Sequence, residues 1–302
     1  MSPQMFRRGL RHLACAAIAL AATGVQAADT SRIVSVGGAV TEILYALGAD
    51  KNIVAVDTTS FYPLRAQTEK ASVGYMRALS AEGMLGLRPS VIIATEGAGP
   101  KETMSVLEAA KVPLIVVPDH YNADGIVEKI QIIAKAVDAE GRGKCMIEKV
   151  KADLDALAKL RPQIKAPKRV MFVLSLINGR AMVAGGHTAA DGVIKMTGAI
   201  NAVTDYDGYK PMSDEAVVAA RPDVILAMAH GGPNHVEAAE LFALPAFSAT
   251  PAAKNKRFIA IDGLSLLFFG PRTARAAREL SIAIHPEGAS APEPGRDDSC
   301  RG

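Results

Sequence analysis

An internal repeat limits the possible folds of this chain more than any other feature. The sequence SAEGMLGLRPSVIIATEGAGP (80–100) can be laid without a gap on SDEAVVAARPDVILAMAHGGP (213–233), at an offset of 133. Nine of the 21 aligned positions are identical. A generic helix–strand turn would share an Arg-Pro pair and some apolar residues, but not the Ser-x-Glu start as well. The repeat therefore predicts two lobes of like fold, each with an equivalent helix followed by an equivalent strand.

A tyrosine loop precedes the repeated helix in both halves. Gly74-Tyr75 aligns with Gly208-Tyr209 when a gap of one residue is allowed in the alignment. A loop at such a place usually needs small or polar residues, and an exposed tyrosine adds little to a core. Two like lobes imply a cleft between them, and a junction between domains is a favoured place for a ligand pocket.

The starts of the two repeated helices are also alike. Ser80 and Ser213 are good N-caps, and each is followed two residues later by an acid, Glu82 and Glu215. Both carboxylates would support their helices through the helix dipole. Their equivalent positions also suggest a symmetric pair that docks on the arginines of a two-fold partner.

Short apolar runs alternate with helical patterns along the chain, which predicts an α/β fold with mainly parallel sheets covered on both faces. We expect two Rossmann-like lobes joined by one long, charged helix of about 22 residues, roughly 33 Å, with a ligand cleft between the lobes. In the second half, strands are expected at 169–175, 223–229 and 257–262, and helices at 188–198 and from about 272 to 283. The expected divisions are a signal peptide (1–27), an N-terminal lobe (28–138), a linker helix (139–166), a C-terminal lobe (167–286) and a disordered tail (287–302).

The first 27 residues have the pattern of a secretory signal peptide. Three arginines precede an apolar run too short to span a bilayer, and small residues follow it. The 34 basic residues of the chain fall to 31 when these arginines are removed, which equals the 31 acidic residues. A neutral exported chain gives no reason to expect a nucleic-acid partner. Cys145 and Cys300 would remain, and a bridge between them is left open.

After the signal, the chain resembles, from end to end, the periplasmic binding proteins in which one rigid helix joins two lobes. These proteins serve ABC importers for vitamin B12, iron siderophores and haem. The stretches GGAVTEILYALG, GYMRALSAEGMLGLRPSVIIA and GYKPMSDEAVVAARPDVILA are most similar to the haem-binding branch. The resemblance implies a monomeric, non-catalytic periplasmic protein that carries haem to an inner-membrane ABC permease and its ATPase. Haem would be the transported ligand, and the mature chain would not insert in the membrane.

The resemblance gives Tyr75 a function, because this residue matches the family's axial ligand, a tyrosinate bound to ferric haem iron. The pKa of a free phenol is about 10, so binding as the phenolate at neutral pH needs help from the ferric ion and a nearby cation. A hard anionic oxygen favours Fe(III), and tyrosinate is a known haem ligand. Arg77 would hydrogen-bond either the phenolate or a propionate. The alternative is a surface tyrosine beside a solvated arginine.

Five further residues are candidate haem or propionate contacts. Tyr209 would stack on the porphyrin, or simply pack. His187 and His230 lie in turns, and some relatives use a second ligand from the opposite lobe; a solvent-exposed role is the alternative. Arg272 would hold a propionate at the start of the last helix, or make a structural salt bridge. Gly38 follows Gly37 in a turn that resembles a phosphate-binding turn, but no G-x-G-x-x-G is present, and the resemblance places the turn on the cleft rim.

Glu82 and Glu215 match the acidic positions that relatives use to engage permease arginines, one in each lobe.

A siderophore or cobalamin carrier of the same class is the nearest alternative function. Such carriers usually line the cleft with aromatic residues or several arginines, so a chain with no tryptophan and only six tyrosines favours haem. An exported α/β enzyme is the alternative from another class. The chain has no Gly-x-Ser-x-Gly elbow and no His-Glu-x-x-His motif to support it.

Overall fold

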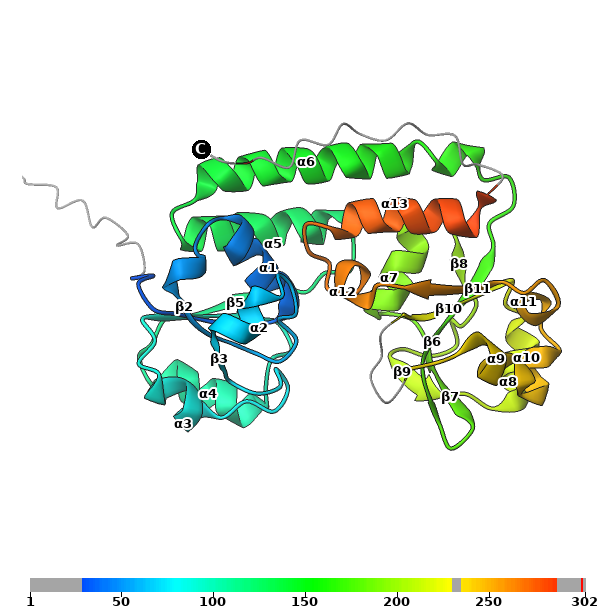
Figure 1. Ribbon diagram of the computed structural model, residues 1–302, viewed down its shortest axis with the longest axis horizontal. Coiled ribbons are helices and arrows are strands. Elements are labelled where there is room, and N and C mark those ends of the chain that lie inside the picture. The colour runs from blue at the N-terminus through cyan, green and yellow to red at the C-terminus, as the bar shows by residue number, and fades with distance from the viewer. Residues whose placement is uncertain (1–28, 230–234, 287–299, 301–302) are drawn as a thin grey trace, which may run out of the picture.

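The computed structural model describes residues 29–229, 235–286 and 300, and it contains two separate sheets (Figure 1). The N-terminal sheet has five strands in the order β3-β2-β1-β4-β5, and every pairing in it is parallel. β1 and β4 at its centre are fully buried, as expected of a parallel sheet covered on both faces. The elements of this lobe are β1 (Ile33–Val36), α1 (Gly38–Ala46), β2 (Ile53–Val56), α2 (Arg65–Glu69), β3 (Ala71–Ser72), α3 (Ala81–Gly86), β4 (Val91–Thr95), α4 (Lys101–Ala109), β5 (Leu114–Val117) and α5 (Ala123–Ala136).

The C-terminal sheet has the order β11-β10-β6-β7-β9, with β8 paired to β6. It is mixed, because β7 runs antiparallel to both β6 and β9. The expected strands and helices of this half are present, but β7, β8 and β9 were not expected. Its elements are β6 (Arg169–Ile177), β7 (Arg180–Ala184), α7 (Ala189–Met196), β8 (Ile200–Asn201), β9 (Tyr209–Pro211), α8 (Asp214–Ala220), β10 (Val224–Met228), α9 (Ala238–Ala243), α10 (Pro245–Ser248), α11 (Pro251–Lys254), β11 (Phe258–Ile261), α12 (Gly263–Leu266) and α13 (Thr273–Ile284).

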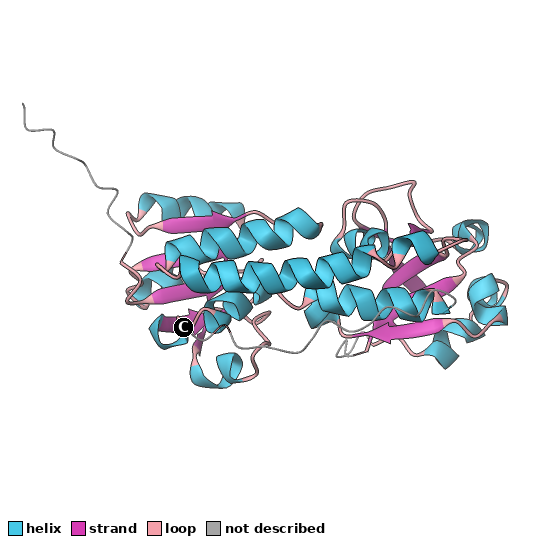
Figure 2. Cartoon of the chain, turned by 90° about the horizontal axis from the view of Figure 1, so that it is seen from above, coloured by secondary structure: helices cyan, strands magenta, loops and turns pink. Residues whose placement is uncertain are grey.

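One long helix joins the lobes, as the sequence predicts. It is α6 (Glu140–Ala158), whose 19 residues correspond to about 28 Å. It lies along the top of both lobes in Figure 1, above α5 on one side and α13 on the other. The view from above in Figure 2 shows long helices running along the axis that joins the two sheets. The helix ends before the expected boundary at 166, because Pro162 follows in a short 3-10 turn and cannot continue an α-helix.

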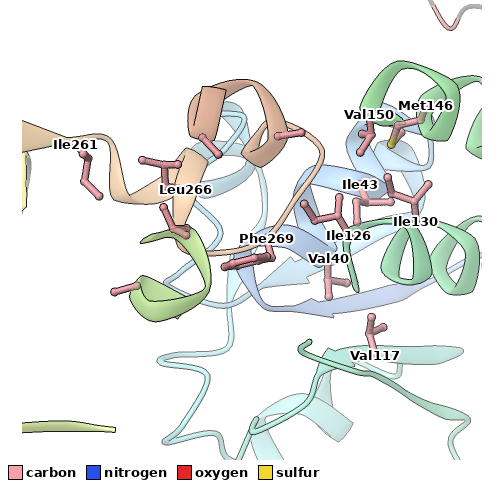
Figure 3. Close-up of a cluster of buried hydrophobic side chains, with 14 of the residues drawn as sticks. Val40, Ile43, Val117, Ile126, Ile130, Met146, Val150, Ile261, Leu266 and Phe269 are labelled. Carbon is pink, nitrogen blue, oxygen red and sulfur yellow. The ribbon is translucent and has the colours of Figure 1, made fainter. Parts of the chain in front are cut away.

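A single cluster of buried apolar side chains runs through both lobes. Figure 3 shows part of it, with Ile43, Ile130 and Met146 around α1, α5 and α6, and Leu266 and Phe269 from the C-terminal lobe. Because protein interiors are close-packed, a shared core resists a large change in the angle between the lobes.

The internal repeat is confirmed to the residue. α3 and α8 begin at an offset of 133, and so do β4 and β10. Arg88 and Arg221, which are aligned, both have a left-handed backbone, with φ of 49° and 45°. Gly74 and Gly208, which precede the two tyrosines, have φ of 85° and 80°, a conformation that only glycine adopts without strain. Tyr75 lies in a loop as expected, but Tyr209 is the first residue of β9, because it pairs with Ala184 of β7.

Cys145 of α6 is bonded to Cys300, with their Cα atoms 5.8 Å apart. A disulfide in a chain with so few cysteines fits an oxidising compartment. The predicted signal peptide and most of the predicted tail lie outside the described residues. In the part of the chain that is described, no helix combines the length and apolar character needed to cross a membrane.

Candidate ligand-binding cleft

A cavity of about 560 Å³ lies between the lobes and receives side chains from both. This volume is within the usual range for small-molecule sites. Its walls are Ala39, Met76, Arg77, Thr95, Asp119 and Tyr121 from the N-terminal lobe, and His187, Thr188, Ala189, Gly208, Tyr209, Leu267 and Phe268 from the C-terminal lobe. On the N-terminal side, β1, β4 and β5 all end at this cavity, which is the edge where parallel sheets usually bind ligands.

Tyr75 lies on a loop whose backbone is fixed at several points. The N–H of Thr58 donates to the carbonyl of Gly74 (2.9 Å), and the N–H of Gly99 donates to that of Met76 (2.9 Å). The turn is closed by the N–H of Ala78, which donates to the carbonyl of Tyr75 (2.8 Å). Met76, the next residue, lines the cavity, whereas Tyr75 is not among the lining residues and is 49 % exposed. A well-ordered loop thus holds a half-exposed phenol at the edge of the cleft.

Arg77 of the same loop lies in the cleft and acts on tyrosines of both lobes. Burial raises the pKa of Tyr209, and the Arg77 guanidinium opposes that rise. Burial likewise raises the pKa of Tyr121, to about 12, with Asp119 adding to the increase and Arg77 opposing it. The geometry therefore brings Arg77 and Tyr209 together in one cleft, and Tyr75 adjoins the lining residue Met76 in the sequence.

The ring of Tyr209 lies on the cleft wall, but its hydroxyl is engaged within its own lobe. Ala190 and Thr188 at the start of α7 lie close enough to the hydroxyl to oppose the rise in the pKa of Tyr209 that burial causes. The ring meets Phe172 edge-on, with 6.5 Å between centroids. The contact with Phe172 supports packing, while Tyr209 as a whole is 36 % exposed and lines the cleft.

His187 is in the cleft wall opposite the Tyr75 loop, and its side chain is exposed. Its Nδ1 is 2.8 Å from Oδ1 of Asp207. The other histidine considered, His230, lies outside the described residues.

Gly38 opens α1 and lies behind the cleft surface rather than in it. A Cβ atom at this position would be 2.5 Å from the ring of Phe268 and 2.8 Å from the carbonyl of Thr59. Glycine is therefore needed for the close approach of Phe268, a cavity-lining residue of the other lobe.

Arg272 makes the structural salt bridge that was the alternative to a propionate contact. Its guanidinium donates two hydrogen bonds to Glu42 (2.9 and 3.0 Å) and stacks on the ring of Tyr62, 3.7 Å from the centroid. Burial raises the pKa of Glu42, and Arg272 opposes that rise. Arg272 is not among the residues that line the cleft, and its pair with Glu42 links the two lobes.

Glu82 and Glu215 are exposed in the first turns of α3 and α8, away from the cleft lining. Their helices are capped as predicted: Ser80 accepts from the N–H of Gly83, and Ser213 from that of Ala216. The two acids therefore occupy equivalent surface positions, one in each lobe.

Sequence reasoning missed a polar cluster at the base of the cleft. Asp119 accepts a hydrogen bond from Lys129, whose side chain is only 2 % exposed, and it lines the cleft beside Tyr121. Lys129 donates in addition to the carbonyl of Phe268 across the lobe junction (3.2 Å). The available signal was position, because Asp119 and Tyr121 closely follow the carboxyl end of a parallel strand, β5.

The chain belongs to the periplasmic binding protein family, whose model matches residues 33–263. Among solved structures, it is similar to the periplasmic heme-binding protein RhuT from Roseiflexus sp. RS-1 in apo form, with 38% identity, a TM-score of 0.79, and coverage of 86% of this chain and 99% of that one. It is also similar to the periplasmic heme-binding protein BhuT in complex with two hemes, with 37% identity, a TM-score of 0.79, and coverage of 85% and 99%. A vitamin B12-binding protein of Yersinia pestis is 27% identical over 240 residues, which cover 79% of this chain and 82% of that protein.

The two-lobe α/β fold predicted from the sequence is thus confirmed, as is the class of helix-linked periplasmic binding protein. This family consists of substrate-binding proteins, and a relative in Bacillus subtilis is described as an ABC transporter substrate-binding lipoprotein.

Proposed function

We propose that this protein binds ferric haem in the inter-lobe cleft and delivers it to the permease of an ABC transporter, without catalysing a reaction. The observation that carries the proposal is the fixed loop that holds Tyr75 and Arg77 at the edge of a 560 Å³ cavity shared by both lobes. Similarity to RhuT and BhuT over almost their full lengths supports haem as the ligand.

The residues of the cleft suit a ligand with apolar faces and anionic edges. Ala39, Met76, Leu267 and Phe268 offer apolar surface, while Arg77 offers a cation at the opening. The negative charge of Asp119 is balanced by Lys129, so it does not repel a carboxylate as a lone acid would. Haem affinity would come mainly from burial of the porphyrin, and the iron–Tyr75 bond and propionate contacts would fix its orientation.

We expect only modest closure of the lobes on binding. The buried core is continuous across the junction, and two ion pairs of low exposure, Glu42–Arg272 and Asp119–Lys129, lie beside it. The distance between Glu82 and Glu215 would therefore stay nearly constant, and the permease would bind a nearly rigid protein. This protein is expected to act in the periplasm as a monomer.

The relative that binds vitamin B12 makes cobalamin the alternative ligand. Equilibrium titration of the purified, mature protein with ferric haem, a ferric hydroxamate siderophore and cyanocobalamin separates these ligands. We expect a saturable change in the haem absorption spectrum and no saturable change with the other two. Saturation by cobalamin or the siderophore, with none by haem, would overturn the proposal and retain only the family assignment.

A further inference from the structure

The loop that carries His187 is held in an unusual backbone conformation. His187 has φ of 54°, in the left-handed region, which is uncommon for a residue other than glycine. Such a conformation persists only where the surrounding structure imposes it, and it is often found at functional sites. The constraint at His187 comes from a second loop of the same lobe.

Residues 185–187 and 206–208 are joined by backbone hydrogen bonds in both directions. The N–H of Gly185 donates to the carbonyl of Gly208 (2.8 Å), and that of Gly186 donates to the carbonyl of Tyr206 (2.8 Å). The N–H of Gly208 returns a bond to the carbonyl of Gly186 (2.9 Å). These three bonds fix the position of His187 relative to Asp207, which lies between the bonded residues.

Two glycines make this close approach possible. A Cβ atom on Gly185 would lie 2.1 Å from the carbonyl of Tyr206. A Cβ atom on Gly186 would lie 2.7 Å from Oδ1 of Asp207, so a side chain there would displace the carboxylate. The sequence thus leaves room for the Asp207 carboxylate beside the histidine.

The contact between the two side chains determines which nitrogen of His187 is free. A carboxylate only accepts hydrogen bonds, so the short contact of 2.8 Å places the proton on Nδ1. In a neutral imidazole with its proton on Nδ1, Nε2 is the nitrogen with a free lone pair that can bind a metal. The pair adds little to the stability of the fold, since the side chains are 86 % and 71 % exposed.

We propose that Asp207 is a positioning residue that presents Nε2 of His187 to haem iron from the C-terminal lobe. This inference rests on the proposed function, because it requires haem in the cleft. His187 lines the cleft and Asp207 does not, so Asp207 acts through the histidine. Partners of this kind orient the imidazole and raise its basicity, and their loss commonly lowers metal affinity by about 10- to 100-fold.

The test is detection of the histidine nitrogen at the iron. Protein labelled with ¹⁵N only in histidine is loaded with ferric haem, and pulsed electron paramagnetic resonance measures hyperfine coupling between ¹⁵N and the iron. The variants are Asp207→Ala, His187→Ala and Asp205→Ala, the last being a matched control because Asp205 is an exposed acid on the same loop. Haem absorption is recorded in parallel at one pH.

We expect ¹⁵N coupling in the parent and in Asp205→Ala, and none in His187→Ala. In Asp207→Ala the coupled fraction should fall by about tenfold, while total haem binding through Tyr75 persists. Full coupling in Asp207→Ala, or no coupling in a parent that binds haem, would overturn the role of Asp207. Failure of the parent to bind haem at all would instead overturn the proposed function, so the two failures are distinguishable.

Discussion

Replacement of Lys129 by methionine is expected to lower the free energy of unfolding by about 3 kcal/mol, because it breaks a buried ion pair and leaves its partner unpaired. The Lys129 side chain is 2 % exposed and donates to Asp119 and to the carbonyl of Phe268. Methionine has a similar length but no donor. The variant therefore loses the hydrogen bond that joins α5 to the C-terminal lobe.

Chemical denaturation of the mature protein, with its disulfide intact, measures this loss. Lys135→Met is the matched control, because Lys135 is an exposed lysine on the same helix and its replacement should change stability by less than about 0.5 kcal/mol. A cost below about 1 kcal/mol for Lys129→Met would contradict the structural importance assigned to the cluster at the cleft base.

The Lys129→Met variant is also expected to bind haem more weakly, since Phe268 and Asp119, the two partners of Lys129, both line the cavity.

Reversal of charge at both Glu82 and Glu215 is expected to abolish haem delivery while haem binding stays unchanged. Both carboxylates are exposed at equivalent helix starts and neither lines the cleft. Close charge pairs at interfaces carry large coupling energies, and a reversed charge replaces attraction by repulsion on both sides of a two-fold partner. Delivery can be measured as haem-dependent stimulation of the ATPase of the reconstituted transporter.

The control for this experiment is reversal of Glu102 and Glu240. These are also exposed acids in the first turns of helices, one in each lobe, so the double variants have the same net charge. The Glu82/Glu215 variant should lose more than tenfold in stimulation, and the control should retain it. Equal stimulation by the two double variants would remove the docking role from Glu82 and Glu215.

The repeat was the most reliable guide to the fold. The same hydrophobic pattern and the same capping serine occur in both halves, so each copy supports the assignment of elements in the other. It located α3, β4, α8 and β10, and it aligned the two tyrosine loops. The antiparallel strand β7 was missed, although Asn178-Gly179 between two apolar runs is a strong hairpin signal. Both residues have positive φ, of 52° and 73°, as that turn requires.

Helix α5 (Ala123–Ala136) was also not predicted, although Asn122 caps it by accepting from the N–H of Gly125. The sequence patterns considered above predict no helix between the strand at 113–118 and the linker helix. The position of Pro162, by contrast, already marked the end of the linker helix before residue 166.

The candidate site was only partly predictable, since it depends on which loops meet across the lobes. Arg77, His187 and Tyr209 do line one cleft, and Tyr75 precedes another of its lining residues, Met76. Arg272 could not be assigned from the sequence, because its partner Glu42 lies 230 residues away. Asp119 and Tyr121 were missed because nothing in their local pattern indicated that Lys129 would be buried beneath them.

The most direct test of the central claim is a ferric haem titration of Tyr75→Phe beside the parent protein. Phenylalanine keeps the ring and removes only the hydroxyl that would bind iron, and Tyr62→Phe is the control because Tyr62 is similarly exposed, 45 % against 49 %, and does not line the cleft. We expect saturable binding with a tyrosinate-type spectrum in the parent and in the control. Tyr75→Phe should lose that spectrum and more than tenfold in affinity, or about 1.4 kcal/mol. An unchanged spectrum and affinity in Tyr75→Phe would contradict the assignment of Tyr75 as the iron ligand.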